Sequence, residues 1–123
     1  MVDQVGGVVA ITELYTNTAT VSTVVYSLPN NSTTPAAITT DGVFQIWIDL
    51  SAMAANDEYE ILVLEKCTSA GSQLAIMTVR MIGTVGTPQW VAPTFILMHG
   101  WDVTMQRIAG SDRSFTWSIR QVA

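Results

Sequence analysis

Apolar and polar side chains alternate, one by one, in the most regular segments of this chain. The alternation is clearest in 101–108 and 114–122, where the large apolar side chains are Trp101, Val103, Met105, Phe115, Trp117 and Ile119. Side chains of a β-strand point to its two faces in turn, so this spacing is typical of strands that are buried on one face. Such strands are stable only when their apolar faces pack together, which favours a fold built from layered sheets.

Six earlier segments also have the composition of strands, namely 7–13, 18–28, 42–50, 58–67, 73–84 and 89–98. Stretches rich in Gly, Pro, Asn, Ser and Asp separate them. Thr and Val are abundant, whereas Lys occurs once, and this composition favours strands over helices. We therefore expect an all-β fold, an antiparallel β-sandwich that is jelly-roll-like and has about eight strands. A length of 123 residues is typical of one domain, so 1–123 is expected to form a single β-sandwich domain.

The last two segments are expected to form a β-hairpin. A loop with an odd number of residues places Met105 opposite Trp117 on the apolar face. The same register places Asp102 opposite Arg120 on the other face, where opposite charges stabilise strand pairing. In this arrangement Arg113, at the turn, has no partner.

The segments 58–67 and 73–82 are expected to form a second hairpin. Its register pairs Tyr59 with Met81, Ile61 with Val79, Val63 with Met77, and Glu60 with Arg80. The face that carries Glu60 also carries Leu62, Leu64 and Ile76, so near its turn this hairpin is apolar on both sides. A second apolar face must be covered by a loop, a helix or a neighbouring subunit. We expect these three apolar residues to lie in an interface between subunits.

Trp47 departs from the core pattern of its strand. It shares its parity with Gln45 and Asp49, and not with Ile46 and Ile48, so its side chain is expected to point away from the core. Aromatic residues are enriched at interface hot spots, and we expect Trp47 to anchor an interface. A flat indole at the surface also suits stacking on a sugar ring, which leaves a carbohydrate-binding module as an alternative.

Residues 1–9 are expected to form an N-terminal arm. The pair Gly6 and Gly7 gives this arm a hinge, because glycine adopts backbone conformations that other residues avoid. Beyond the hinge, Val8 and Val9 are candidates for contact with a neighbouring copy of the chain. These features favour a homo-oligomer, a dimer or a trimer.

Charge and composition narrow the classes of partner. Charged residues make up 12% of the chain and the net charge is −5, whereas nucleic-acid binding needs clustered Lys and Arg, so we expect no nucleic-acid partner. No apolar run is long enough for a transmembrane helix and the N-terminus lacks a signal-peptide pattern, so we expect no membrane partner. Cys67 is the only cysteine, which rules out an intrachain disulfide and fits folding in a reducing cytoplasm.

Candidate catalytic residues are few. His99 is the only histidine, and the densest acidic cluster is Asp57, Glu58 and Glu60. Carboxylates and a histidine serve many hydrolases, so a hydrolase is kept as a further hypothesis. No motif spaces these residues for catalysis or for metal binding, so we expect a protein that is not an enzyme and has no cofactor or metal. The acidic cluster is then expected to be a solvated strand edge, and Cys67 a small buried side chain.

Four stretches carry a resemblance to a known group of proteins: VGGVVAITELYTNTATVS, YSLPNNSTT, DGVFQIWIDLSAMAANDEYEILVLEK and IAGSDRSFTWSIRQVA. Over nearly the whole chain they resemble small all-β virion proteins encoded in the structural gene clusters of tailed bacteriophages. Within this group the chain is most similar to capsid decoration, or cement, proteins. The likeness lies in amino-acid composition and in the local sequence pattern, and it includes no motif tied to a site. No residue role is therefore transferred.

The resemblance implies a structural role in the virion. Decoration proteins bridge neighbouring capsid subunits on the shell as dimers or trimers. The expected partners are therefore a major capsid protein or other virion proteins, together with further copies of this chain. The expected location is the virion, assembled in the host cytoplasm. A tail or head-to-tail connector component is the alternative from the same gene clusters.

Overall fold

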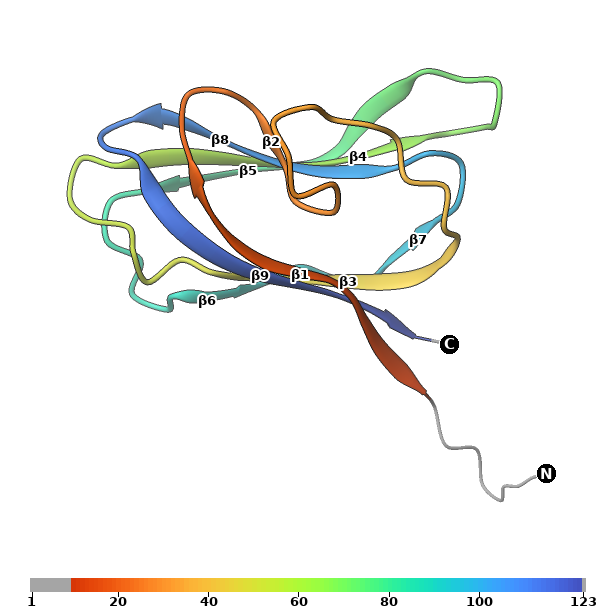
Figure 1. Cartoon of the computed structure of the whole chain (residues 1–123), viewed down its shortest axis with the longest axis horizontal. Coiled ribbons are helices and arrows are strands. Elements are labelled where there is room, and N and C mark those ends of the chain that lie inside the picture. Colours follow the sequence, from red (N-terminus) through yellow and green to blue (C-terminus); the bar gives the residue numbers. More distant parts are fainter. Residues whose placement is uncertain (1–9, 123) are drawn as a thin grey trace.

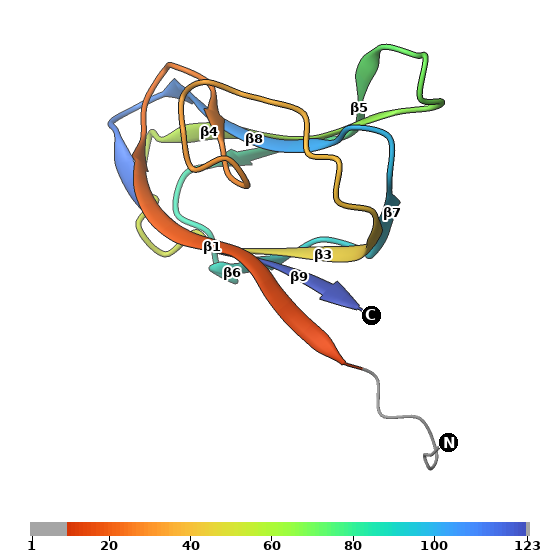
Figure 2. The same ribbon diagram turned by 45° about the vertical axis from the view of Figure 1, so that its right-hand side comes forward.

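The computed structural model describes residues 10–122, which form nine strands and no helix (Figure 1). The strands are β1 (Ile11–Val21), β2 (Tyr26–Ser27), β3 (Gly42–Asp49), β4 (Glu58–Lys66), β5 (Gln73–Ile82), β6 (Gln89–Val91), β7 (Phe95–Leu97), β8 (Asp102–Ala109) and β9 (Arg113–Val122). Sheet A has the order β1-β9-β3-β6, with β7 also paired to β3, and sheet B has the order β2-β8-β4-β5. The two sheets lie face to face as separate layers, also in the turned view (Figure 2). The predicted antiparallel β-sandwich is confirmed.

Strand pairing is nested along the chain. β1 pairs with β9, β2 with β8, β3 with β6 and β7, and β4 with β5, all in the antiparallel sense. The chain therefore resembles one long hairpin that turns back between β4 and β5. This hairpin is rolled up, because β3 also pairs with β9 and β4 also pairs with β8. Two layers connected in this way make a jelly roll, as the sequence predicts.

The strand count is nine because the predicted strand 89–98 is broken into β6 and β7. The break contains Pro93, which has no N–H to donate to a strand ladder. Both pieces pair with β3, so together they fill the place of one jelly-roll strand. The polar segment 29–41 is a loop, and Ile38 within it forms an isolated bridge with Trp101.

The first strand is longer than predicted. The segments 7–13 and 18–28 are expected to form two strands, but residues 11–13 of the first and 18–21 of the second lie in one continuous strand, β1, which has a bulge near its start. The intervening residues continue the ladder with β9, because Thr and Tyr favour extended backbone. Residues 1–9, and with them Val8, Val9 and the expected arm, lie outside the described residues.

The core fills the space between the inner faces of the two sheets. Its largest fully buried side chains are Trp101, Trp117, Tyr59, Phe44, Phe115, Leu28, Ile46, Ile48, Leu50, Ile61, Leu97 and Met105. The apolar faces predicted for β8 and β9 are both part of this core. Parity therefore assigns the inward side chains of these strands correctly.

The pairing predicted for β8 and β9 is wrong. β8 pairs with β2 and β4 in sheet B, whereas β9 pairs with β1 and β3 in sheet A. The connection 110–112 crosses from one sheet to the other. The expected pairs of Met105 with Trp117 and Asp102 with Arg120 do not form, because the apolar faces of the two strands meet across the core and not side by side.

The hairpin between β4 and β5 has the predicted register. Tyr59 pairs with Met81, Glu60 with Arg80, Ile61 with Val79, and Val63 with Met77. Arg80 binds two carboxylates, with Nη1 at 2.8 Å from Glu58 and Nη2 at 2.8 Å from Glu60. A bulge next to Val63 shifts the register for the last residues before the turn.

Candidate functional site

The outer face of sheet A carries mostly polar side chains in three rows that cross its strands. The rows are Glu13, Arg120 and Gln45; Thr16, Ser118, Trp47 and Val91; and Thr18, Thr116, Asp49 and Gln89. Residues directly opposite each other in antiparallel strands point to the same face, so each row lies on one side of the sheet. The rows join β1, β9, β3 and β6, which are far apart in the sequence.

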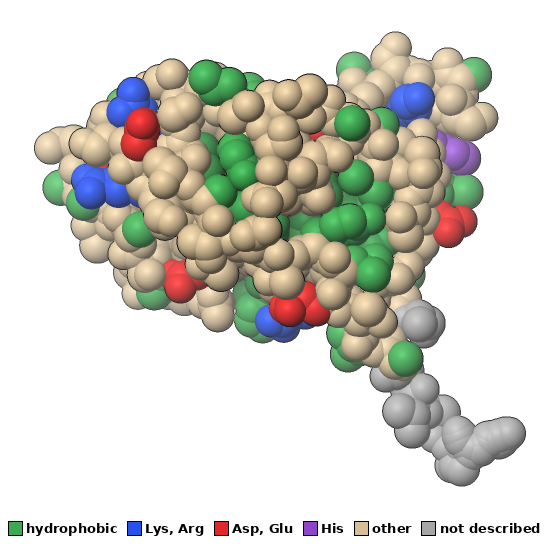
Figure 3. All heavy atoms as spheres, viewed as in Figure 1, with side chains coloured by type: hydrophobic (Ala, Val, Ile, Leu, Met, Phe, Trp, Pro, Cys, Tyr) green, Lys and Arg blue, Asp and Glu red, His purple; other side chains and the backbone are tan. Residues whose placement is uncertain are grey.

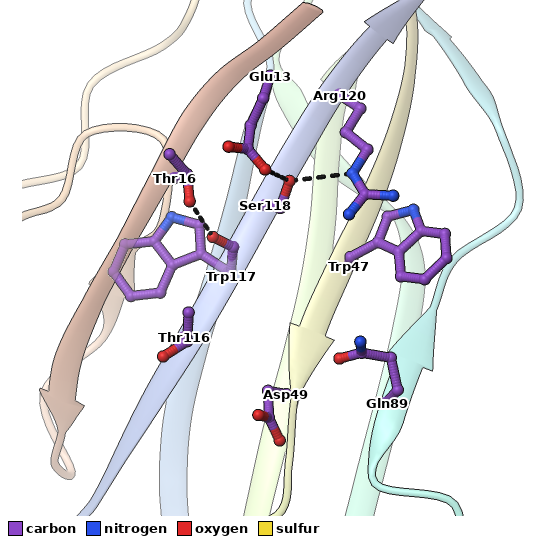
Figure 4. A pocket seen from close by; sticks show the side chains of 9 residues that line it. All are labelled: Glu13, Thr16, Trp47, Asp49, Gln89, Thr116, Trp117, Ser118 and Arg120. Carbon is purple, nitrogen blue, oxygen red and sulfur yellow. Dashed lines mark hydrogen bonds between the residues drawn. The ribbon is translucent and has the colours of Figure 1, made fainter. Parts of the chain in front are cut away.

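A hollow of about 250 Å³ lies over these rows (Figure 4). Its floor is β9, where the outward side chains Thr116 and Ser118 are short. Longer side chains on both sides of this floor leave the hollow between them. The lining residues are Glu13, Thr16, Trp47, Asp49, Gln89, Thr116, Trp117, Ser118 and Arg120.

Arg120 and Trp47 form one wall of the hollow. The central carbon of the Arg120 guanidinium lies 4.1 Å from the centroid of the Trp47 ring, which is a cation–π contact. Nε of Arg120 donates a hydrogen bond to Oγ of Ser118 over 3.1 Å, and that hydroxyl donates to the Glu13 carboxylate. These contacts orient Arg120, while its terminal amino groups bind no carboxylate among the described residues.

Asp49 and Gln89 lie at another part of the rim, and both are exposed. Hydrogen bonds from the hydroxyl and the backbone N–H of Ser51 hold the pKa of Asp49 below its usual value, so its carboxylate is charged at neutral pH. The Gln89 amide forms no hydrogen bond with the side chains or backbone of the described residues. The rim therefore offers a charged acceptor and a free amide beside the hollow.

The geometry of the hollow suits the binding of a ligand more than the hydrolysis of a glycosidic bond. Its two carboxylates, Glu13 and Asp49, belong to rows that are four residues apart on β9, and to strands on either side of it. This register corresponds to about 13 Å along the strands and about 10 Å across them. The paired carboxyl groups of glycosidases are only about 5–9.5 Å apart. No His, Cys or Lys lines the hollow.

Exposed apolar side chains gather on and next to the strands that end the two sheets at one side of the sandwich. Ten large apolar side chains are exposed among the described residues, and six of them lie on or next to β5, β6 and β7: Leu74, Ile76, Ile82, Val91, Ile96 and Met98. β5 ends sheet B and β6 and β7 end sheet A, so the strands on or next to which these six residues lie border the same side of the sandwich, behind β1 and β2 in Figure 1. Ile82, opposite Glu58, points outward from sheet B, whereas Val91, opposite Trp47, and Ile96, opposite Val43, point outward from sheet A. We call this surface the β5–β7 flank. Ile82 and Ile96 are its most exposed members, at 70% and 76%.

β5 is also an open strand edge. Among the described residues it pairs with β4 alone, so the backbone groups along its other side have no strand partner. Its ten residues include one charge, that of Arg80, which Glu58 and Glu60 neutralise. Long apolar edge strands are templates for pairing with another chain, and proteins usually protect them. The edge therefore coincides with the three flank residues that lie on β5, Leu74, Ile76 and Ile82.

The interface residues predicted from the sequence fall on three surfaces. Trp47 is half-buried on the outer face of sheet A, where parity places it, and belongs to the wall of the hollow. Leu62 and Leu64 are half-buried on the outer face of sheet B. Ile76 is 49% exposed and belongs to the β5–β7 flank. Sequence reasoning missed the other five members of the flank, although Leu74 and Ile82 lie on the same predicted strand as Ile76.

The acidic cluster is not the solvated strand edge that the sequence predicts. The side chain of Asp57 is 1% exposed, and it forms an ion pair with Nε of Arg113 over 2.7 Å. It also accepts hydrogen bonds from the backbone N–H of Ala54 over 2.9 Å and of Ser111 over 3.1 Å. Arg113 and these two N–H groups lower the pKa of Asp57 to about 2. Asp57 thus holds two loops together, and Arg113, expected to be free, is its partner.

The structure does not bring together the residues of the hydrolase hypothesis. The backbone N–H of His99 lies 3.3 Å from the Glu65 carboxylate near the end of β4, whereas Asp57 precedes the start of β4. Glu65 is eight residue positions after Asp57, along a nearly fully extended stretch, which corresponds to about 26 Å. Cys67 is exposed, not buried as expected, because it follows β4 in the turn to β5. In residues 10–122, no three His, Cys, Asp or Glu side chains are grouped so that they could hold a metal ion.

Comparison of this chain with models of protein families, with curated proteins and with solved structures finds no match. Jelly rolls include both viral capsid domains and lectins, so the fold alone does not choose between assembly and sugar binding. In the part of the chain that the structure describes, no helix is long and apolar enough to cross a membrane.

Proposed function

We propose that this chain is a structural assembly protein whose β5–β7 flank binds a neighbouring protein subunit. The observation that carries the proposal is the open, nearly uncharged edge strand β5, which carries the exposed apolar side chains of Leu74, Ile76 and Ile82, with three more on or next to the strands that end sheet A at the same side. Grouped apolar side chains mark contact sites on soluble proteins. Burial of such surface against a partner is favourable by roughly 25 cal/mol per Å².

The charge distribution supports an apolar contact. Only 12% of the residues are charged, and on the face drawn in Figure 3 the Lys and Arg side chains are scattered, several of them beside Asp or Glu. That view shows the side opposite the flank; on the flank, the one charged residue of β5, Arg80, is paired with Glu58 and Glu60, so no broad field of one sign attracts a partner there from a distance. Shape and apolar burial would therefore supply most of the binding free energy.

In its most specific form, the proposal is a capsid decoration protein of a tailed bacteriophage. The resemblance of the sequence to small all-β virion proteins supports this form. Its partners are then the major capsid protein or other virion proteins and further copies of this chain in a dimer or trimer, and its location is the virion. Many copies on one shell bind with avidity, so each contact needs only modest affinity. A tail or head-to-tail connector component is the alternative, with the same flank and a different virion partner.

The first test is the oligomeric state, measured by size-exclusion chromatography with light scattering. We expect a dimer or trimer that dissociates in the variants Ile82→Asp and Ile96→Asp, because each places a charge in the flank. The matched control is Val24→Asp. Val24 is 53% exposed and lies between β1 and β2, at the opposite side of the sandwich, so this variant should keep the parent's oligomeric state.

The second test is cosedimentation with shells assembled from the major capsid protein encoded in the same gene cluster. We expect binding to assembled shells and weaker binding to the free capsid protein, with loss of shell binding in Ile82→Asp. Binding to tail or connector complexes in place of shells would support the alternative. A monomer that binds none of these assemblies would contradict the proposed function.

A further inference from the structure

We propose that the hollow on sheet A binds one ring of an uncharged sugar. This site is separate from the assembly role proposed for the β5–β7 flank, and neither depends on the other. The inference rests on the size of the hollow, on the polar groups that line it, on their charges and on the position of Trp47.

Size favours a single ring. The hollow measures about 250 Å³. This volume is just below the roughly 300–1,000 Å³ of typical sites for drug-sized ligands. The hollow lies on the outer face of sheet A and opens to solvent there, so the rest of a longer glycan can extend away from the surface while one ring occupies it.

The polar groups match hydroxyls, which both donate and accept hydrogen bonds. The terminal amino groups of Arg120 are donors, the Asp49 carboxylate is an acceptor, and the Gln89 amide is both. Hydroxyl groups of Thr116 and Ser118 line the floor beside them, and that of Thr16 lies next to it on β1. Each is hydrogen-bonded within the protein and keeps a lone pair that can accept from a ligand. A ligand that carries several hydroxyls on one ring can use donors and acceptors of this mixed kind at once.

The charges of the hollow disfavour ionic ligands. Glu13 and Asp49 are acidic and Arg120 is basic, so the lining has a net charge of one minus. A phosphate or carboxylate ligand would meet two carboxylates for one guanidinium. A cation would meet the guanidinium, whose position is fixed by its contact with Trp47. An uncharged ligand avoids both costs.

Trp47 supplies an apolar surface in this polar setting. The outer face of an antiparallel sheet is usually polar, and a half-buried tryptophan there leaves apolar area in contact with water. The C–H groups of a sugar ring can cover the part of that area that the Arg120 guanidinium leaves free, while its hydroxyls reach the polar groups of the floor and rim. Arg120 stiffens this wall because its guanidinium packs on the indole.

The test is an NMR titration of the full chain with D-glucose, D-galactose, D-mannose and N-acetyl-D-glucosamine, and with D-glucuronate as the charged counterpart. We expect at least one uncharged sugar to shift the indole N–H of Trp47 and the backbone amides of Asp49 and Ser118. The dissociation constant should be on the order of 1 mM, as for a small ligand at an open site. D-glucuronate should bind at least tenfold more weakly.

Two variants locate the site. Trp47→Ala should weaken binding at least tenfold, and Gln89→Ala should weaken it severalfold. The matched control is Gln106→Ala, because Gln106 is a half-buried amide on β8, in the other sheet, and should leave binding unchanged. Gln89 is exposed, so its variant keeps the test valid even if Trp47→Ala unfolds the chain.

Three results would overturn the inference. One is the absence of shifts at the hollow with all four uncharged sugars. Another is preferred binding of D-glucuronate. The third is sugar binding that is unchanged both in Gln89→Ala and in a Trp47→Ala variant that remains folded. Because none of these measurements involves Ile82 or Ile96, failure of sugar binding leaves the test of assembly intact.

Discussion

Arg113 donates a hydrogen bond from Nε to Oδ2 of the buried Asp57 over 2.7 Å and joins the first residue of β9 to the loop before β4. The same carboxylate accepts the backbone N–H of Ser111, within the connection that crosses from sheet B to sheet A. The hydroxyl of Tyr59 donates to the carbonyl of Ser111 over 2.7 Å. The crossing of the chain between the two layers is therefore fixed by one buried ion pair and its neighbours.

Removal of Arg113 should destabilise the fold strongly. In Arg113→Met the Asp57 carboxylate remains buried and loses its charged partner, which is costly in a protein interior. We expect the thermal unfolding midpoint to fall by on the order of 10 °C. The measurement is thermal unfolding followed by circular dichroism.

The matched control for that variant is Arg80→Met. Arg80 also binds two carboxylates, but its side chain is 45% exposed, and exposed ion pairs contribute little. The midpoint of this variant should fall by no more than about 4 °C. An equal fall in the thermal unfolding midpoint of Arg113→Met and Arg80→Met would contradict the structural role assigned to Asp57.

Acid should weaken the fold through Asp57. The pKa of its carboxyl group is about 2 in the folded protein, against a usual value of 3.8. Below about pH 4 the unfolded chain takes up a proton that the folded protein does not, so stability from this group is present above pH 4 and is lost as the pH falls towards 2. The variant Asp57→Asn lacks this contribution. The difference in midpoint between parent and variant should therefore shrink between pH 4 and pH 2, and a constant difference would contradict the assignment.

Asp102 should show the opposite dependence on pH. Burial raises its pKa, despite hydrogen bonds from Oγ of Ser27 over 2.6 Å and from the N–H of Val103 over 2.8 Å. Above pH 3.8 the folded protein holds this proton more tightly than the unfolded chain, so stability from Asp102 falls as the pH rises through its folded pKa. Asp102→Asn keeps an oxygen acceptor without the charge. Relative to the parent, this variant should become more stable as the pH rises from 3 to 7, and thermal unfolding over that range measures the trend.

Gly110 should resist substitution. Its φ is +89°, and a Cβ at this position would lie 2.3 Å from Oδ1 of Asp57 and 2.6 Å from its Cα. Gly110→Ala should therefore lower the free energy of unfolding by about 1–3 kcal/mol, from strain and from displacement of the buried ion pair. Gly86→Ala is the control, because no atom lies within 4 Å of a Cβ there. Chemical denaturation should show a change within about 1 kcal/mol for that control.

Local pairing could be predicted from the sequence, and distant pairing could not. The β4–β5 hairpin closes over a short turn, so the parity of its apolar residues and the pair Glu60 and Arg80 were enough to set its register. For β8 and β9 the same reasoning failed. Asp102 and Arg120 share an outward parity, but they belong to different sheets.

The candidate sites show the same division. Parity placed Trp47 outside the core, yet it did not indicate that Arg120 would pack on its ring, because β3 and β9 are joined only by long-range pairing. It identified Ile76 as an apolar residue on a second face. It did not indicate that β6 and β7 would bring Val91 and Ile96 to the same side of the sandwich.

The sequence by itself determined which side chains of each strand point inward, because the period of two is a property of the extended backbone. The tertiary structure decided which strands are neighbours. A sandwich has two inward faces, so strands that meet across its core show the same parity as strands paired within one sheet. Only the packing of the layers distinguishes the two cases, and it is this packing that makes Asp57 the partner of Arg113 and Trp47 the partner of Arg120.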